Sequence, residues 1–209
     1  MTTWQKRYAE RMGGVNSSII RELLKLTQIP GLISFAGGLP APEIFPTEIC
    51  ATATARLLKE QGQVALQYSA TEGYAPLRQL IVDKLRATGI ELTIDNVQIT
   101  SGSQQGLDLI GKMMLDPHDV ILTEQPSYLG ALQAWKAYQA DFVTVPVDDD
   151  GIDVDAMEEV LRESNPKFMY ILPNFQNPAG VTLSLERRKK LVALANQYGV
   201  PIVEDDPYG

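Results

Sequence analysis

The sequence predicts an α/β fold in which a mostly parallel sheet is covered by helices on both faces. Two observations support this prediction. From residue 46 onward, helical stretches alternate with short apolar runs of strand length, an order typical of parallel sheets. Polar motifs also follow several of the apolar runs, at the strand ends where sheets of this kind bind their ligands. The preceding residues, 1–45, have a different pattern and are interpreted as an N-terminal arm.

The individual elements follow from the spacing of apolar residues. In the arm, one amphipathic helix is expected at about 17–27, followed by a stretch rich in Gly and Pro. A 3.6-residue apolar period predicts the later helices, and short apolar runs predict the strands. The predicted helices cover 47–60, 74–88, 103–115, 127–138, 153–164 and 184–198. The predicted strands cover 96–100, 120–123, 142–147, 168–172 and 201–204.

Composition excludes several classes of function. The 209 residues carry a net charge of -8, which provides no basic surface for nucleic acid or anionic lipid. The chain has one cysteine and one histidine, too few for the usual zinc sites or for catalysis by a Cys-His or Ser-His pair. We expect Cys50 to be a small buried residue and His118 to lie in a turn. The N-terminus shows no apolar leader and the chain no membrane-length apolar run, so a cytoplasmic location is expected.

The first polar motif is Gly102-Ser103-Gln104-Gln105, at the start of a predicted helix. Small residues there leave backbone N–H groups and a hydroxyl at the positive end of the helix dipole, where an anion such as phosphate can bind. A plain serine N-cap would explain the same residues.

The second and third motifs follow the next predicted strands. Pro126-Ser127-Tyr128 places an aromatic ring that could lie against a planar ligand. Asn177, in Asn177-Pro178-Ala179-Gly180, could donate a hydrogen bond to a phenolate oxygen. The alternatives are an ordinary tyrosine at the core or surface and an ordinary Asn-Pro turn.

The fourth motif, Glu204-Asp205-Asp206-Pro207-Tyr208, follows the last apolar strand. Its three carboxylates could hold a divalent metal. Alternatively, one aspartate could keep a pyridine nitrogen protonated, because a nearby negative charge favours the cationic form. A separate acidic run, Asp148-Asp149-Asp150, is interpreted as a solvated turn.

Taken together, these motifs supply a phosphate cradle, an aromatic face, an amide donor, a carboxylate and a phenol. A phosphorylated, electron-poor heterocycle requires this set of partners. The motifs therefore point to pyridoxal 5'-phosphate as the cofactor.

From about residue 15 to the last residue, the chain resembles the fold-type I pyridoxal-phosphate aminotransferases of class I and II, specifically their N-terminal half. The segments 20–26, 34–42 and 67–74 resemble the 2-aminoadipate and kynurenine aminotransferase branch. The resemblance implies the three-layer α/β fold of the aspartate aminotransferase type. It also implies an arm over 1–45 that belongs to the small domain of the complete fold, and a cofactor-binding large domain over 46–209.

The resemblance also implies roles for individual residues. Gly102, Ser103 and Gln104 would hold the cofactor phosphate, and Tyr128 would stack on the ring. Asp205 would pair with the ring nitrogen. The 3' oxygen would be bound by Asn177 and Tyr208. Tyr68 would reach the phosphate of the neighbouring subunit in a homodimer.

Two further matched positions lie near the substrate. Arg21 is a candidate for binding a substrate carboxylate through its planar guanidinium, although an arginine on a helix surface would have the same pattern. Gly38 matches a second position near the substrate.

The chain differs from the complete family members in one respect. The lysine that binds the cofactor covalently, and the arginine that binds the substrate α-carboxylate, would both lie beyond Gly209. Lys189 and Lys190 belong to a predicted exposed helix face and do not replace them. These 209 residues are therefore expected to contain no catalytic residue, to be inactive alone, and to fold poorly or aggregate when produced alone.

The implied function is transfer of an amino group from an amino acid of the 2-aminoadipate, aromatic or branched-chain type to a 2-oxo acid such as 2-oxoglutarate. One alternative is the ligand-sensing domain of a transcription regulator, since some regulators fuse a winged helix to an aminotransferase-like domain. Another is a nucleotide-binding α/β protein, but the segment 102–106 matches neither the dinucleotide fingerprint nor a Walker lysine motif.

Overall fold

The computed structural model describes residues 4–14, 29, 31–33 and 40–209. By their contacts, the residues divide into two compact units: Met1–Asn16 together with Ser101–Gly209, and Ser17–Thr100. The helix expected at about 17–27 lies wholly outside the described residues. The division of the complete fold into an arm over 1–45 and a large domain over 46–209 stays a prediction.

The unit Ser17–Thr100 contains two α-helices among its described residues, α2 (Thr47–Ala65) and α3 (Ala75–Arg86). Two short 3-10 helices accompany them, η3 (Pro42–Ile44) and η4 (Ile94–Asn96). The predicted strand over 96–100 is wrong, because none of these residues forms a strand. A backbone hydrogen bond from Ile99 to the Glu72 carbonyl holds the segment (2.9 Å).

The buried Arg78 of α3 also fixes this segment. Its guanidinium donates to the carbonyls of Val97 (2.8 Å) and Ile94 (2.7 Å). Helix α2, by contrast, contains no buried residue. The expectation that Cys50 is buried is therefore wrong, because Cys50 lies in α2 and is exposed.

The other unit contains the predicted sheet. Its strands are β1 (Val120–Gln125), β2 (Asp141–Asp148), β3 (Gly151–Ile152), β4 (Phe168–Ile171) and β5 (Ile202–Glu204). They lie in the order β3-β2-β1-β4-β5. All neighbours are parallel except β2 and β3, which form a short antiparallel hairpin. The mostly parallel sheet is thus confirmed; β3, with only two residues, was not predicted.

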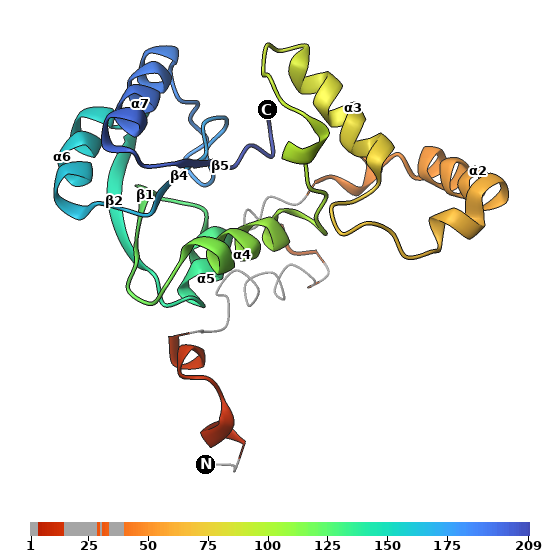
Figure 1. The fold of residues 1–209 in the computed structure, drawn as a ribbon, viewed down its shortest axis with the longest axis horizontal. Coiled ribbons are helices and arrows are strands. Elements are labelled where there is room, and N and C mark those ends of the chain that lie inside the picture. Colours follow the sequence, from red (N-terminus) through yellow and green to blue (C-terminus); the bar gives the residue numbers. More distant parts are fainter. Residues whose placement is uncertain (1–3, 15–28, 30, 34–39) are drawn as a thin grey trace. The chain divides into compact units, whose positions relative to one another are not determined.

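Helices cover both faces of this sheet (Figure 1). One face packs against α4 (Ser103–Met114) and α5 (Leu129–Lys136), and the other against α6 (Val154–Ser164) and α7 (Leu185–Tyr198). Side chains alternate between the two cores along a strand. In β4, Phe168 and Tyr170 point toward α4 and α5, while Met169 and Ile171 point toward α6 and α7. In the same unit, the described N-terminal residues form the 3-10 helices η1 (Gln5–Arg7) and η2 (Glu10–Gly14).

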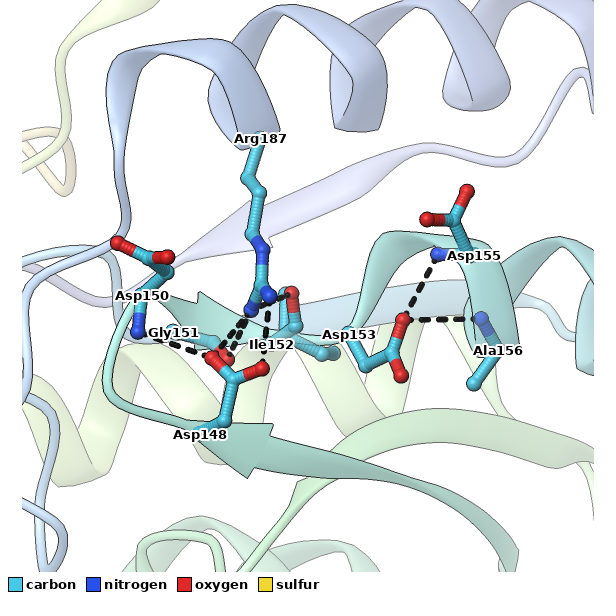
Figure 2. Close-up of polar contacts among 8 residues, drawn as sticks. All are labelled: Asp148, Asp150, Gly151, Ile152, Asp153, Asp155, Ala156 and Arg187. Atoms are coloured by element: carbon cyan, nitrogen blue, oxygen red, sulfur yellow. Dashed lines mark hydrogen bonds and ion pairs between the residues drawn. The ribbon is translucent and has the colours of Figure 1, made fainter.

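The acidic run begins with the last residue of β2, Asp148, and continues as the predicted turn over 149–150; Figure 2 shows how Asp148 is paired. Arg187 of α7 binds Asp148 through two hydrogen bonds (2.6 and 2.7 Å) and also donates to the carbonyls of Gly151 and Ile152. The Arg187 guanidinium holds the pKa of Asp148 below its ordinary value. Asp153 caps α6 by accepting hydrogen bonds from two backbone N–H groups.

Two features are absent from the part of the chain that the structure describes. No group of three or more His, Cys, Asp or Glu side chains is arranged to hold a metal ion. None of the described helices has both the length and the apolar character needed to cross a membrane.

Candidate functional site

The strand order reverses at the centre of the sheet, between β1 and β4. After β1 the chain continues to β2 on one side, then crosses back and adds β4 and β5 on the other. Loops leaving the carboxyl ends of β1 and β4 therefore diverge, and sheets of this type bind ligands in the resulting crevice. The motifs at 126–128, 174–180 and 205–208 follow β1, β4 and β5 at this edge.

Helix α4 begins with Gly102 as its N-cap. The backbone of Gly102 has φ 79° and ψ 167°, a conformation that only glycine adopts without strain. Ser103 and Gln104, the first two helical residues, are exposed, and the first turn contains no acidic residue. The positive end of the helix dipole is thus uncompensated by a local carboxylate and suits an anion.

Tyr128 is the N-cap of α5 and lies next to the start of α4. Its half-buried ring packs against Gly130 so closely that a Cβ atom there would lie 2.5 Å from ring atoms. The Gly130 carbonyl accepts a hydrogen bond from Nε2 of Gln104 (3.3 Å). The structure therefore brings together the predicted ring-stacking residue and the predicted phosphate-binding residues.

Asp205 directly follows β5, and its side chain is held by Tyr170 of β4. The fully buried Tyr170 donates its phenolic O–H to Oδ2 of Asp205 (2.7 Å). Burial raises the pKa of Tyr170, and the hydrogen bond to Asp205 raises it further, so the phenol stays protonated and remains a donor. Asp205 also donates its backbone N–H to the Ile171 carbonyl (3.0 Å). Its carboxylate is thus fixed at the strand end.

Asn177 is half-buried in the turn that follows β4. The preceding residue, Gln176, is 2% exposed and donates from Nε2 to the Pro126 carbonyl (2.7 Å). The same nitrogen lies 3.4 Å from the buried Glu124. Burial raises the pKa of Glu124 to about 7, although hydrogen bonds from the Leu172 N–H and from Gln176 oppose this shift.

The segment after Asp205 contacts the loop after β4 through Asp206. Asn174 donates to Oδ2 of Asp206 (3.0 Å), and the backbone N–H of Gly209 donates to Oδ1 (3.0 Å). Tyr208 lies between Asp206 and Gly209 in the sequence and is 54% exposed. Its phenol is therefore accessible to a ligand.

For three predicted site residues, the structure gives no position relative to the others. Tyr68 belongs to the unit Ser17–Thr100 and is 99% exposed. Arg21 and Gly38 lie outside the described residues. The individual roles of all the site residues stay predictions.

Sequence reasoning missed Glu124, Tyr170 and Gln176. Two of them lie inside strands, where an apolar run gave no reason to separate them from core residues. The third occupies an Asn-Pro turn motif, in which attention fell on Asn177. A carboxylate within the apolar run Val-Ile-Leu-Thr-Glu was the one available signal, since a buried acid needs hydrogen-bond partners.

Comparison with known proteins identifies the family. Residues 41–209 match the model of "Aminotransferase class I and II", so the chain belongs to this family. It is 50% identical over 206 residues to the 2-aminoadipate transaminase of Thermus thermophilus. That alignment covers 99% of this chain and 51% of the relative. The chain thus spans about half the length of this curated relative.

Solved structures show the same relationship. The α-aminoadipate aminotransferase LysN of Thermus thermophilus, complexed with N-(5'-phosphopyridoxyl)-L-leucine, superposes with a TM-score of 0.89 at 47% identity. The kynurenine aminotransferase of Pyrococcus horikoshii gives a TM-score of 0.91 at 41% identity. Each comparison covers 99% of this chain, with 51% and 52% of the respective neighbour. These neighbours confirm the predicted fold class.

The chain is also similar to a transcriptional regulator. The chain is 33% identical over 193 residues to an uncharacterized HTH-type transcriptional regulator of Escherichia coli, and this match covers 92% of the chain and 41% of the regulator.

Proposed function

We propose that this chain forms part of a pyridoxal-phosphate-dependent aminotransferase. Its reaction would move an amino group from an amino acid of the 2-aminoadipate, aromatic or branched-chain type to a 2-oxo acid such as 2-oxoglutarate. The observation that carries the proposal is the carboxylate of Asp205, which Tyr170 fixes at the strand end that a ligand would face. The similarity to 2-aminoadipate and kynurenine aminotransferases supports the substrate class.

The donor set of the described residues fits this cofactor. A helix N-terminus whose first turn contains no acidic residue, at Gly102 to Gln104, suits a phosphate. The half-buried Tyr128 offers an aromatic face beside it. The hydroxyl of Ser127, in the same loop, is buried and has no hydrogen-bond partner in the structure, which is consistent with a polar group that a ligand would complete.

Each residue would have a defined task. Asp205 would hold a proton on the ring nitrogen, since a carboxylate stabilises the adjacent cation. Asn177 and Tyr208 would donate to the 3' oxygen. When bound, pyridoxal phosphate supplies an electron sink that stabilises negative charge at the substrate α-carbon. Tyr170 would keep the Asp205 carboxylate oriented toward the ring.

The remaining parts of the enzyme belong to the proposal as well. The lysine that binds the cofactor and the arginine that binds the α-carboxylate would lie in the part of the family fold that follows residue 209. Arg21 and Gly38 would contact the substrate. Tyr68, fully exposed here, would reach the phosphate of a second copy in a cytoplasmic homodimer. The 209 residues alone would be inactive.

A direct test uses the protein encoded by the complete reading frame. Purified protein mixed with pyridoxal phosphate should show an absorption band of bound cofactor that borohydride abolishes. It should then convert 2-aminoadipate and 2-oxoglutarate to the corresponding oxo acid and glutamate. Absence of any cofactor band would refute the proposal, and a band without turnover of any amino acid would refute its catalytic part.

A regulator remains the second candidate function, supported by the similarity to the HTH-type regulator of Escherichia coli. The gene would then encode a DNA-binding domain fused in frame to this chain. Cofactor binding without transamination, together with specific DNA binding in a mobility-shift assay, would favour this candidate.

A further inference from the structure

Gln176 is buried, and each of its polar functions has a partner. Its Nε2 atom donates to the carbonyl of Pro126 (2.7 Å) and lies 3.4 Å from Oε2 of Glu124. Its Oε1 atom accepts the backbone N–H of Ala179 (2.7 Å). Both amide hydrogens and the carbonyl oxygen are therefore engaged, which is the condition for burying a glutamine at low cost.

Two of these partners, Pro126 and Ala179, lie in different loops, while Glu124 lies in β1. Pro126 is two residues before Tyr128, in the loop that leaves β1. Ala179 lies in the turn after β4, two residues beyond Asn177. The contacts to Pro126 and Ala179 are to backbone groups, so they fix the path of each loop.

We propose that Gln176 is a positioning residue that couples these two loops, so that Tyr128 and Asn177 reach the cofactor together. This inference rests on the proposed function and deepens it. Gln176 itself touches neither the cofactor nor the substrate in this proposal. It acts through the backbone on either side of it.

Glu124 defines the orientation of the Gln176 amide. The acid accepts the Leu172 N–H at 3.0 Å, and with the Pro126 carbonyl it presents two oxygen acceptors to one side of the glutamine. The amide nitrogen must therefore face them, and the amide oxygen must face Ala179. A flipped amide would place oxygen against oxygen. Glutamine satisfies all of these partners, whereas glutamate could not donate to both acceptors.

The proposal predicts a spectroscopic change that loosened packing alone would not produce. If Asn177 donates to the cofactor 3' oxygen, that bond stabilises the deprotonated form of the oxygen. Displacing Asn177 would then raise the pH at which the absorption of the bound cofactor changes. Displacing Tyr128 would weaken cofactor binding through lost ring contact.

The test uses the complete protein loaded with pyridoxal phosphate. Gln176→Met keeps the side-chain length but removes all three hydrogen bonds. We expect the midpoint of the cofactor absorption titration to rise by about one pH unit, and the cofactor dissociation constant to increase about tenfold. Gln197→Met, an equivalent change at an exposed position of α7, should leave both values unchanged.

A double-mutant cycle assigns the effect to Asn177. If Gln176 acts through Asn177, the variant carrying both Gln176→Met and Asn177→Ala should show the same midpoint as Asn177→Ala alone. Additive shifts, or an unchanged midpoint in Gln176→Met, would overturn the inference while leaving the proposed function intact. Absence of a cofactor band in the parent protein would instead refute the proposed function.

Gln176→Glu provides a second variant if the methionine protein does not fold. It keeps the acceptor for Ala179 and loses the paired donors, so we expect the midpoint and the dissociation constant to shift in the same directions. If neither variant folds, Gln176 is required for folding and the proposal is overturned.

Discussion

The phenol of Tyr170 donates a 2.7 Å hydrogen bond to the carboxylate of Asp205 across two neighbouring parallel strands. Tyr170 is fully buried among the residues that pack under α4 and α5, and its ring lies edge-on to Trp135 with 4.9 Å between centroids. A rigid aromatic core thus fixes one donor to the proposed partner of the cofactor nitrogen. The predictions that follow are for the complete protein.

Tyr170→Phe removes this donor and keeps the ring. Because a hydrogen bond to a charged group contributes about 1.5–3 kcal/mol, we expect lower stability and a cofactor dissociation constant raised about tenfold. Calorimetric melting and cofactor titration measure the two effects.

Tyr138→Phe is the matched control. Tyr138 also donates to an aspartate, Asp108 (3.0 Å), but this bond is exposed and joins α4 to the end of α5. We expect cofactor affinity to stay unchanged in this variant. Equal losses of affinity in both tyrosine variants would contradict the role given to Tyr170.

The buried Glu124 predicts a pH dependence of stability. Its pKa is about 7 in the folded protein and 4.5 ordinarily, so the folded state binds the proton more tightly than the unfolded chain. The contribution of Glu124 to the free energy of unfolding therefore decreases as pH rises from about 4.5 to about 7, by about 3 kcal/mol in total.

Glu124→Gln removes this titration. As pH rises from 5 to 8, we expect the melting temperature of the variant to increase relative to that of the wild type. Glu159→Gln changes an exposed glutamate of α6 and should show no such trend. A pH-independent difference for Glu124→Gln would show that the carboxyl titrates normally.

Replacing either of two glycines in the same segment by alanine should have opposite effects on stability. No atom lies within 4 Å of a Cβ built on Gly102 or on Gly106, so space does not distinguish them. Gly102 has φ 79°, and alanine there should cost about 1–3 kcal/mol and weaken cofactor binding. Gly106 lies within α4, where alanine should stabilise by about 0.5–1 kcal/mol. Thermal melts of both variants test this difference in sign.

Substitution of Arg187, which lies outside the candidate site, should affect stability alone. Arg187→Lys loses the paired hydrogen bonds to Asp148 and cannot also reach the carbonyls of Gly151 and Ile152 (Figure 2). We expect a lower melting temperature with unchanged cofactor affinity. Arg162→Lys, at a surface ion pair with Glu158 (3.9 Å), should have almost no effect. A loss of cofactor affinity in Arg187→Lys would contradict the separation of this contact from the site.

Much of the fold could be predicted because the apolar pattern and the elements agree. The run Val120 to Thr123 is apolar on both faces, as expected for a central parallel strand, and the structure shows it at the centre of the sheet. The segment 96–100 alternates polar and apolar residues, which also predicts a strand, but none of its residues forms one. Local pattern cannot distinguish these cases, because a strand also needs a partner at a matching edge.

The site was predicted in part for a related reason. Tyr128 and Asp205 were proposed because they follow apolar runs, and the structure places both at the carboxyl edge of the sheet; their roles stay predictions. Tyr170 and Glu124 were missed, since their importance depends on which strands are neighbours. Strand order is a property of the whole sheet and cannot be inferred from a single segment.

The two cores of the sheet, one under α4 and α5 and the other under α6 and α7, give protein engineers a practical separation. Leu122, Met157 and Met169 lie in the core under α6 and α7, so volume-conserving apolar substitutions that seek higher thermostability there replace none of the side chains that would meet vitamin B6. Libraries aimed at altered specificity should instead vary the opposite layer and its loops.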